Sequence, residues 1–140
     1  MKSGIGLTLA LFYCQNVPGS SDGERRDLEL KYGSRVRFFP IACSGRLESL
    51  HLLRALESFA DAAYVVTCPE GMCRYFEGNR RARKRVEQAR SIIRSIGLEE
   101  ERAGIVVHSG EQAKPLATVT EEILEGISAL GVSMVHRNVA

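Results

Sequence analysis

Residues 5–13 read IGLTLALFY, a mostly apolar run, and Cys14 follows it directly. A short run of this kind is typical of a strand buried in a parallel sheet. Lys2 ahead of the run gives it some likeness to a signal peptide. However, Phe12 and Tyr13 are bulky where a processing site needs small residues, and the run is too short to span a bilayer. We therefore predict a buried strand in a cytoplasmic protein with no membrane span.

Three further apolar runs follow, at residues 36–42, 62–67 and 104–108, and each is followed by residues that suit a turn. Segments with helical periodicity separate the runs, at residues 24–31, 47–59, 80–96 and 118–130. The expected buried stripes of the last three helices are Leu47, Leu50, Leu53 and Leu56; Val86, Ala89, Ile93 and Ile96; and Ile123, Ile127 and Leu130. Gly131 is the expected cap of the last helix.

Alternation of strands and helices is the pattern of a parallel sheet covered on both faces. The chain has 140 residues, of which 44% are hydrophobic, and this is enough for one domain spanning residues 1–140. The sequence therefore predicts an α/β fold: a three-layer domain with a four-stranded, mainly parallel sheet of the Rossmann or flavodoxin kind.

The cysteines stand at the ends of the predicted strands. Cys14, Cys43 and Cys68 each follow a strand, and Cys73 shares a loop with Cys68 that contains Pro69 and Gly71. Because parallel strands end at one edge of a sheet, four thiols should meet there. Thiols placed for packing would more often fall inside the apolar runs. We therefore predict that all four hold a metal ion or cluster.

Four thiolates suit zinc, a [2Fe–2S] cluster or a [4Fe–4S] cluster equally well. Structural zinc usually comes with two short cysteine spacings, whereas only one is present here, so the spacing slightly favours iron and sulfur. Disulfides are the weaker alternative, since nothing marks the chain for an oxidising compartment. A thiol–disulfide switch at Cys68 and Cys73 and a metal-free interaction subunit stay open.

Three segments occur in an order that resembles a known family. They are Cys43-Ser44-Gly45-Arg46, Cys68-Pro69-Glu70-Gly71-Met72-Cys73 and Glu77-Gly78-Asn79. The chain resembles the delta subunit of methyl-viologen-reducing hydrogenase from about residue 12 to residue 127. The resemblance implies a non-catalytic relay subunit with one [2Fe–2S] cluster on Cys14, Cys43, Cys68 and Cys73. It also implies partners: a hydrogenase or formate dehydrogenase on one side and a flavin-containing heterodisulfide-reductase-type subunit on the other, often in electron-bifurcating complexes of anaerobes.

The chain departs from the family pattern after the first strand. The family usually has Cys-x-x-Cys there, whereas this chain has Cys14 and then Val17. Valine cannot bind a metal, so the four remaining cysteines are just enough for one cluster. We expect Cys14 to be the first ligand because it stands at the strand end.

Other polar residues carry weaker predictions. His108 ends the fourth predicted strand and is expected to be a solvated histidine rather than a replacement ligand. Arg46 either offsets the charge of a cluster or pairs with Glu48. The basic run at residues 80–85 predicts a solvated helix face or a docking face for an acidic redox partner. A net charge of +2 and few nearby aromatic residues argue against nucleic acid.

Overall fold

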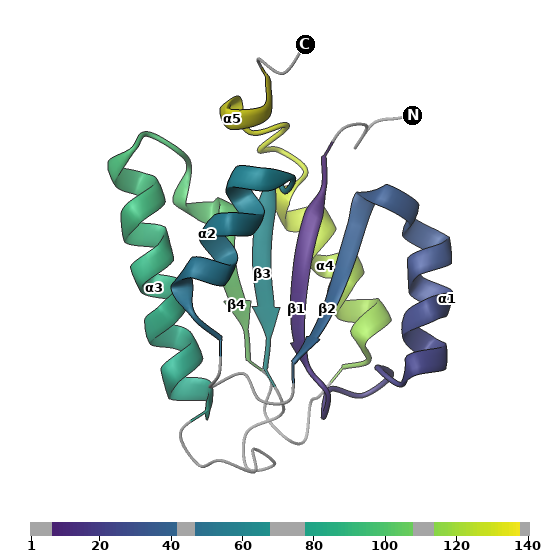
Figure 1. Ribbon diagram of the computed structural model, residues 1–140. Coiled ribbons are helices and arrows are strands. Elements are labelled where there is room, and N and C mark those ends of the chain that lie inside the picture. Colours follow the sequence, from purple (N-terminus) through teal and green to yellow (C-terminus); the bar gives the residue numbers. More distant parts are fainter. Residues whose placement is uncertain (1–6, 42–46, 68–77, 108–113, 138–140) are drawn as a thin grey trace.

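The computed structural model describes residues 7–41, 47–67, 78–107 and 114–137 (Figure 1). Its strands are β1 (Leu9–Cys14), β2 (Val36–Ile41), β3 (Ala62–Val66) and β4 (Ala103–Val106). All strand pairs are parallel, and the order across the sheet is β2-β1-β3-β4. The predicted four-stranded parallel sheet is thereby confirmed. The first strand begins at Leu9, later than the apolar run suggested, and it includes Cys14.

Four longer helices cover the two faces of the sheet. They are α1 (Asp22–Tyr32), α2 (Ser49–Ser58), α3 (Gly78–Ser95) and α4 (Leu116–Ile127). Helices α1 and α4 pack on one face, and α2 and α3 on the other, which gives the three predicted layers (Figure 1). Two 3-10 turns, η1 (Gly33–Arg35) and η3 (Glu100–Arg102), and the short helix α5 (Met134–Arg137) complete the described elements.

Strand β1 lies in the middle of the sheet and is buried on both faces. Leu9, Leu11 and Tyr13 belong to the core under α1 and α4, while Ala10 and Phe12 face α2 and α3. A strand covered on both sides needs apolar residues at every position, because successive side chains point to opposite faces. This is why residues 9–13 show no polar alternation.

Two helices depart at single positions from the buried faces that their periodicity predicted. In α2 the buried residues are Leu52, Ala55 and Leu56, and Leu50 is 51% exposed. In α3 the predicted residues Val86, Ala89 and Ile93 are buried, but Ile96, which follows the helix, is 63% exposed. The helix ends at Ser95, and Gly97, with a φ of 92°, turns the chain so that Leu98 takes the next core position instead.

The start of α1 and the end of α4 also differ from what the sequence predicted. Helix α1 begins at Asp22, two residues earlier than predicted, because Ser21 and Glu24 form a capping box. Helix α4 ends at Ile127 with Ser128 as its cap, and Gly131, with a φ of 70°, closes the following turns rather than the helix itself. Among the described residues, no helix combines the length and the hydropathy that crossing a bilayer would require.

Candidate functional site

The strand order defines where a site can form. The chain runs from β1 to β2 on one side and then to β3 on the other side of β1, so the order reverses between β1 and β3. In open α/β sheets, ligands bind at the carboxyl ends of the two strands that flank such a reversal. Here those ends are Cys14 on β1 and Val66 on β3.

Cys14 is placed as the sequence predicted, at the carboxyl edge of the central strand. Its side chain is 1% exposed and belongs to the core cluster that also contains Tyr13 and Val17. The backbone N–H of Val17 donates to the Cys14 carbonyl oxygen at 3.0 Å, which closes a turn directly after the strand. Val17 therefore occupies a buried apolar position beside Cys14, where the family usually has its second cysteine.

The other predicted ligands, Cys43, Cys68 and Cys73, lie outside the described residues, as do Arg46 and His108. The residues that lead to Cys43 and Cys68 are described. Ile41 pairs with Cys14 across β1 and β2, and its carbonyl accepts the Gln15 N–H at 3.0 Å. Thr67 is buried after β3 and donates its N–H to the Val106 carbonyl at 3.0 Å. The described strands thus reach the edge on both sides of Cys14.

The surroundings of Cys14 suit a soft, anionic metal centre. In a parallel α/β sheet each helix that follows a strand begins at the carboxyl edge, so the amino ends of α1 to α4 point toward that edge (Figure 1). Helix amino ends carry partial positive charge and stabilise anions. Within the described residues no group of three His, Cys, Asp or Glu side chains could hold a metal, and Cys14 is the one predicted ligand among them.

The loop after β1 is fixed to the start of α4. The N–H of Leu116 donates to the Pro18 carbonyl at 2.8 Å, and Gly19 lies so close to Pro115 that an added Cβ would be 3.2 Å from the proline Cβ. Gly19 also has a φ of 71°, a backbone conformation that residues with side chains disfavour. The backbone that leads from Cys14 to α1 is thereby held against the start of α4, at the same edge of the sheet.

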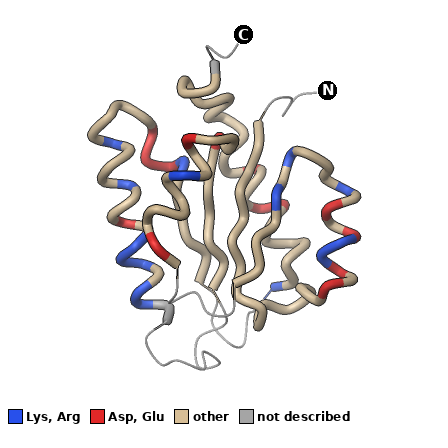
Figure 2. The backbone as a smooth tube through the Cα atoms, in the orientation of Figure 1, with Lys and Arg blue, Asp and Glu red and all other residues tan. Residues whose placement is uncertain are grey.

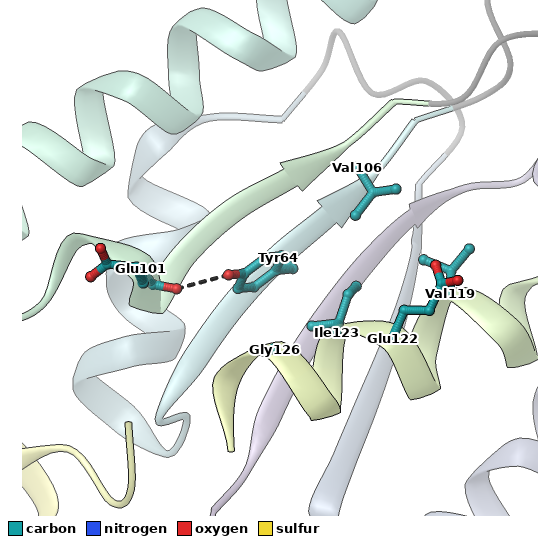
Figure 3. Close-up of a pocket in the computed structure, with 7 residues that line it drawn as sticks. All are labelled: Tyr64, Glu101, Val106, Val119, Glu122, Ile123 and Gly126. Carbon is teal, nitrogen blue, oxygen red and sulfur yellow. Dashed lines mark hydrogen bonds between the residues drawn. The ribbon is translucent and has the colours of Figure 1, made fainter. Parts of the chain in front are cut away.

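A cavity of about 270 Å³ lies between the edge strand β4 and α4 (Figure 3). Most of its lining is apolar, including Val106, Val119 and Ile123. Tyr64 donates its hydroxyl to the Glu101 carbonyl at 2.8 Å, and burial raises the pKa of that phenol. The cavity offers no nucleophile or paired acid and base, so we regard it as a packing gap beside an edge strand.

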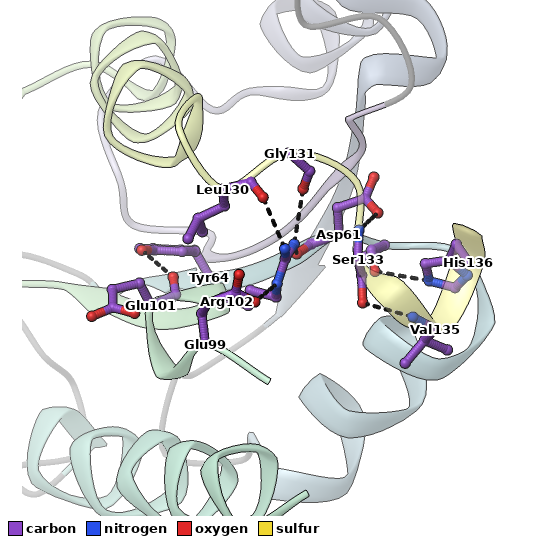
Figure 4. Close-up of polar contacts among 11 residues, drawn as sticks. Asp61, Tyr64, Glu99, Glu101, Arg102, Leu130, Gly131, Ser133, Val135 and His136 are labelled. Carbon is purple, nitrogen blue, oxygen red and sulfur yellow. Dashed lines mark hydrogen bonds and ion pairs between the residues drawn. The ribbon is translucent and has the colours of Figure 1, made fainter. Parts of the chain in front are cut away.

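A buried charged network occupies the opposite, amino edge of the sheet (Figure 4). Arg102 is 1% exposed, and its Nη1 donates to the carbonyls of Asp61 at 2.9 Å and Gly131 at 3.0 Å. Its Nη2 donates to Leu130, and its Nε pairs with Glu99 at 2.7 Å. Sequence reasoning missed this network, because a single arginine has no periodic signal.

The Asp61 carboxylate completes that network. Its two oxygens accept the backbone N–H groups of Thr8 and Ser133, both at 2.8 Å. Nearby, His136 Nε2 lies 2.9 Å from the Leu56 carbonyl, so this nitrogen carries the proton. These groups are satisfied by the backbone and lie at the edge opposite Cys14, and their role is structural.

Comparisons with known proteins identify the family to which the chain is similar. The family described as the delta subunit of methyl-viologen-reducing hydrogenase matches residues 9–131. The iron-sulfur subunit of the vhu F420-non-reducing hydrogenase of Methanopyrus kandleri is 32% identical over 72% of this chain and 76% of its own length. The iron-sulfur subunit of the F420-non-reducing hydrogenase of Archaeoglobus profundus is 33% identical over 74% of this chain and 76% of its own length.

A different relative matches through only part of its length. One chain of the ferredoxin/F420H2-dependent CoB-CoM heterodisulfide reductase of Methanosarcina acetivorans is 25% identical over 86% of this chain but only 14% of its own length. The same kind of domain therefore occurs both as a small separate chain and within a much longer protein. With most of its residues matched by the family, this chain belongs to the delta subunits of methyl-viologen-reducing hydrogenase.

Proposed function

We propose that this chain is an electron-transfer subunit with one [2Fe–2S] cluster held by Cys14, Cys43, Cys68 and Cys73. It relays electrons between a hydrogenase or formate dehydrogenase and a flavin-containing heterodisulfide-reductase-type subunit in a cytoplasmic, hetero-oligomeric redox complex. When bound, the cluster supplies one-electron oxidation and reduction. The chain turns over no substrate of its own.

The observation that carries this proposal is the position of Cys14. A cysteine stands at the carboxyl end of the central strand, beside the reversal in strand order, and the strands that precede Cys43 and Cys68 end on either side of it. Family membership supports the same reading, since the relatives named above include iron-sulfur subunits of hydrogenases. The likeness to part of a heterodisulfide reductase supports a partner of that type.

The residues around Cys14 give the site two properties. Tyr13 and Val17 bury the cysteine and exclude water on the side of the core. A dry, apolar shell lowers the local dielectric and so influences the reduction potential of a metal centre. The amino ends of the helices provide positive potential toward thiolates at the same edge.

Anaerobic purification tests the proposal. We expect brown protein with about two irons and two sulfides per chain and visible thiolate-to-iron absorption. Cys14→Ser should lose most of the iron. Val17→Ala is the matched control, because it alters packing at the same turn without removing a thiol, and it should retain the iron while unfolding at lower urea.

Other outcomes separate the alternatives. Colourless protein with one zinc per chain would support a structural metal subunit, and metal-free protein whose Cys68 and Cys73 oxidise reversibly would support a thiol switch. Full iron content in Cys14→Ser would exclude Cys14 as a ligand. Iron without transfer of electrons to a co-purified flavin protein would contradict the relay.

A further inference from the structure

The face of the molecule formed by α2 and α3 carries a groove with exposed apolar side chains. The groove has a volume of about 280 Å³, and its lining includes Leu53 of α2, Ile92 of α3, Ile96 directly after α3, and Val135 of α5. Ile92 is 46% exposed, Ile96 63% and Val135 42%. Single exposed apolar residues are common, but several gathered in one groove are typical of an interaction surface.

Basic residues crowd the first turns of α3, next to the carboxyl edge of the sheet (Figure 2). Arg80, Arg81, Arg83 and Lys84 are all exposed, and the first turn contains no acidic residue. Cations are unfavourable at the amino end of a helix, where the dipole is positive. Helix stability therefore does not account for this cluster.

Charges farther along α3 are neutralised within the molecule. Arg90 pairs with Glu87 and Glu100, and Arg94 pairs with Glu100 at 2.9 Å. By contrast, the ion pairs among the described residues do not involve Arg81 or Lys84. Arg81, Arg83 and Lys84 thus present positive charge for which the described part of the chain shows no ion pair.

The basic and apolar parts form one continuous surface. Residues 81, 85 and 92 are separated by four and seven positions, a spacing that places them along one side of α3. Ile96 follows the end of the helix and lines the same groove as Ile92. This side of α3 faces α2, because Arg85 pairs with Glu48 just before α2 and Ile92 shares the groove with Leu53. Lys84 lies on the exposed flank of the same side.

We propose that this α2–α3 surface, defined by Leu53, Arg81, Lys84, Ile92, Ile96 and Val135, docks a partner protein whose contacting surface is an apolar ridge with carboxylates at one end. The ridge fills the groove, and the carboxylates pair with Arg81 and Lys84 near the carboxyl edge. An apolar centre with a charged rim is the usual composition of such an interface. The charge also orients the partner toward the edge where Cys14 lies.

Nucleic acid fits this surface less well than a protein does. A phosphate backbone would contact the basic turns but leave Ile92 and Ile96 exposed to water. The described part of α3 also contains no aromatic side chain on which a base could stack. The proposal concerns docking alone and holds whether or not the chain carries the cluster, so iron content is measured separately on the same material.

Zero-length coupling of amines to carboxylates provides a direct test. The chain has four lysines, Lys2, Lys31, Lys84 and Lys114, so each coupled peptide is assignable. Carbodiimide treatment of the native complex, isolated anaerobically through a tag on this chain, should join Lys84 to an Asp or Glu of one co-purified protein present at one copy per chain. Lys31, which is exposed on α1, serves as the internal control.

Matched variants extend the test to both parts of the surface. We expect Arg81→Gln/Lys84→Gln to weaken association about tenfold or more at moderate salt, with the complex dissociating at lower NaCl. Arg26→Gln/Arg83→Gln removes the same amount of charge, from α1 and from the opposite flank of α3, and should change the association little.

The apolar part of the surface is tested in the same way. Ile92→Gln/Ile96→Gln should also weaken association, whereas Leu30→Gln, at a residue 85% exposed on α1, should not.

Several results would overturn the proposal. Coupling of Lys84 to a second copy of this chain would show that the surface is a contact between copies. Dissociation by nuclease would show that nucleic acid holds the complex together. Equal effects of the α2–α3 variants and their controls would remove any special role for the surface.

Discussion

The ring of Tyr64 lies directly against the Cα of Gly104, its neighbour across β3 and β4. The two residues are paired in register, and a Cβ built on Gly104 would lie 2.6 Å from Tyr64 Cζ. A real Cβ does not tolerate this distance, so the tyrosine ring fits over β4 only because residue 104 has no side chain.

The first prediction follows from that contact. Gly104→Ala should push the ring aside and break the hydrogen bond from Tyr64 to Glu101, lowering the free energy of unfolding by about 1–3 kcal/mol in urea titrations. Gly126→Ala is the control, because a Cβ on Gly126 meets no atom within 4 Å and alanine favours a helix. If Gly104→Ala were as stable as the wild type, the Tyr64 ring would be able to move aside without a cost in stability.

The buried guanidinium at the amino edge gives a second prediction. Arg102→Met should lower the free energy of unfolding by about 3 kcal/mol or more, because it leaves the backbone carbonyls of Asp61, Leu130 and Gly131 without the donor that binds them. Amide hydrogen exchange should rise at residues 131–136, which Arg102 and Asp61 hold. Arg94→Met, at a side chain 57% exposed, should change stability by only about 0.5 kcal/mol. Equal losses in both variants would contradict a special role for Arg102.

Glu100 gives a prediction about pH. The hydrogen bond from Arg94 and the nearby charges hold the pKa of Glu100 below its ordinary value of 4.5. Because the folded-state pKa is the lower one, the stabilisation is present above pH 4.5 and is lost as the pH falls through the folded-state value. Arg94→Gln should raise this pKa, measured by carboxyl NMR titration, whereas the distant Arg26→Gln should leave it unchanged.

Val17 gives a prediction that depends on the proposed cluster. Val17→Cys should leave the iron content unchanged and alter the free energy of unfolding by less than about 1.5 kcal/mol, because cysteine packs as a small apolar residue. Cys14→Ser/Val17→Cys should remain iron-poor, since the side chain at position 17 is buried in the core. Recovery of iron in the double variant would show that position 17 reaches the metal.

The strands were predictable because each is an apolar run buried on a sheet, and Cys14 was correctly expected at the carboxyl edge. The sheet order was not predicted, since it depends on which side of β1 each crossover packs. The predicted stripe of α2 was wrong at Leu50, because helical periodicity does not say which of two adjacent apolar faces meets the sheet. The stripe of α3 was wrong only at Ile96, because the helix ends at Ser95.

The candidate site was predictable only in part. Cys14 is confirmed at the strand end, and the roles of Cys43, Cys68 and Cys73 stay predictions, because these residues lie outside the described ones. Asp61 and Arg102 went unnoticed because their partners are mostly backbone groups from distant segments. Such partners leave no pattern in the sequence around either residue.

One carboxylate, that of Asp61, binds backbone groups from near both ends of the described chain, Thr8 and Ser133. Polypeptide attached before Thr8 or after Ser133 would therefore leave the domain from the side remote from Cys14. Segments from near both ends of the described chain thus meet at the edge of the sheet opposite Cys14. Joining the domain to a longer protein at these points would leave the carboxyl edge, where Cys14 lies, unobstructed.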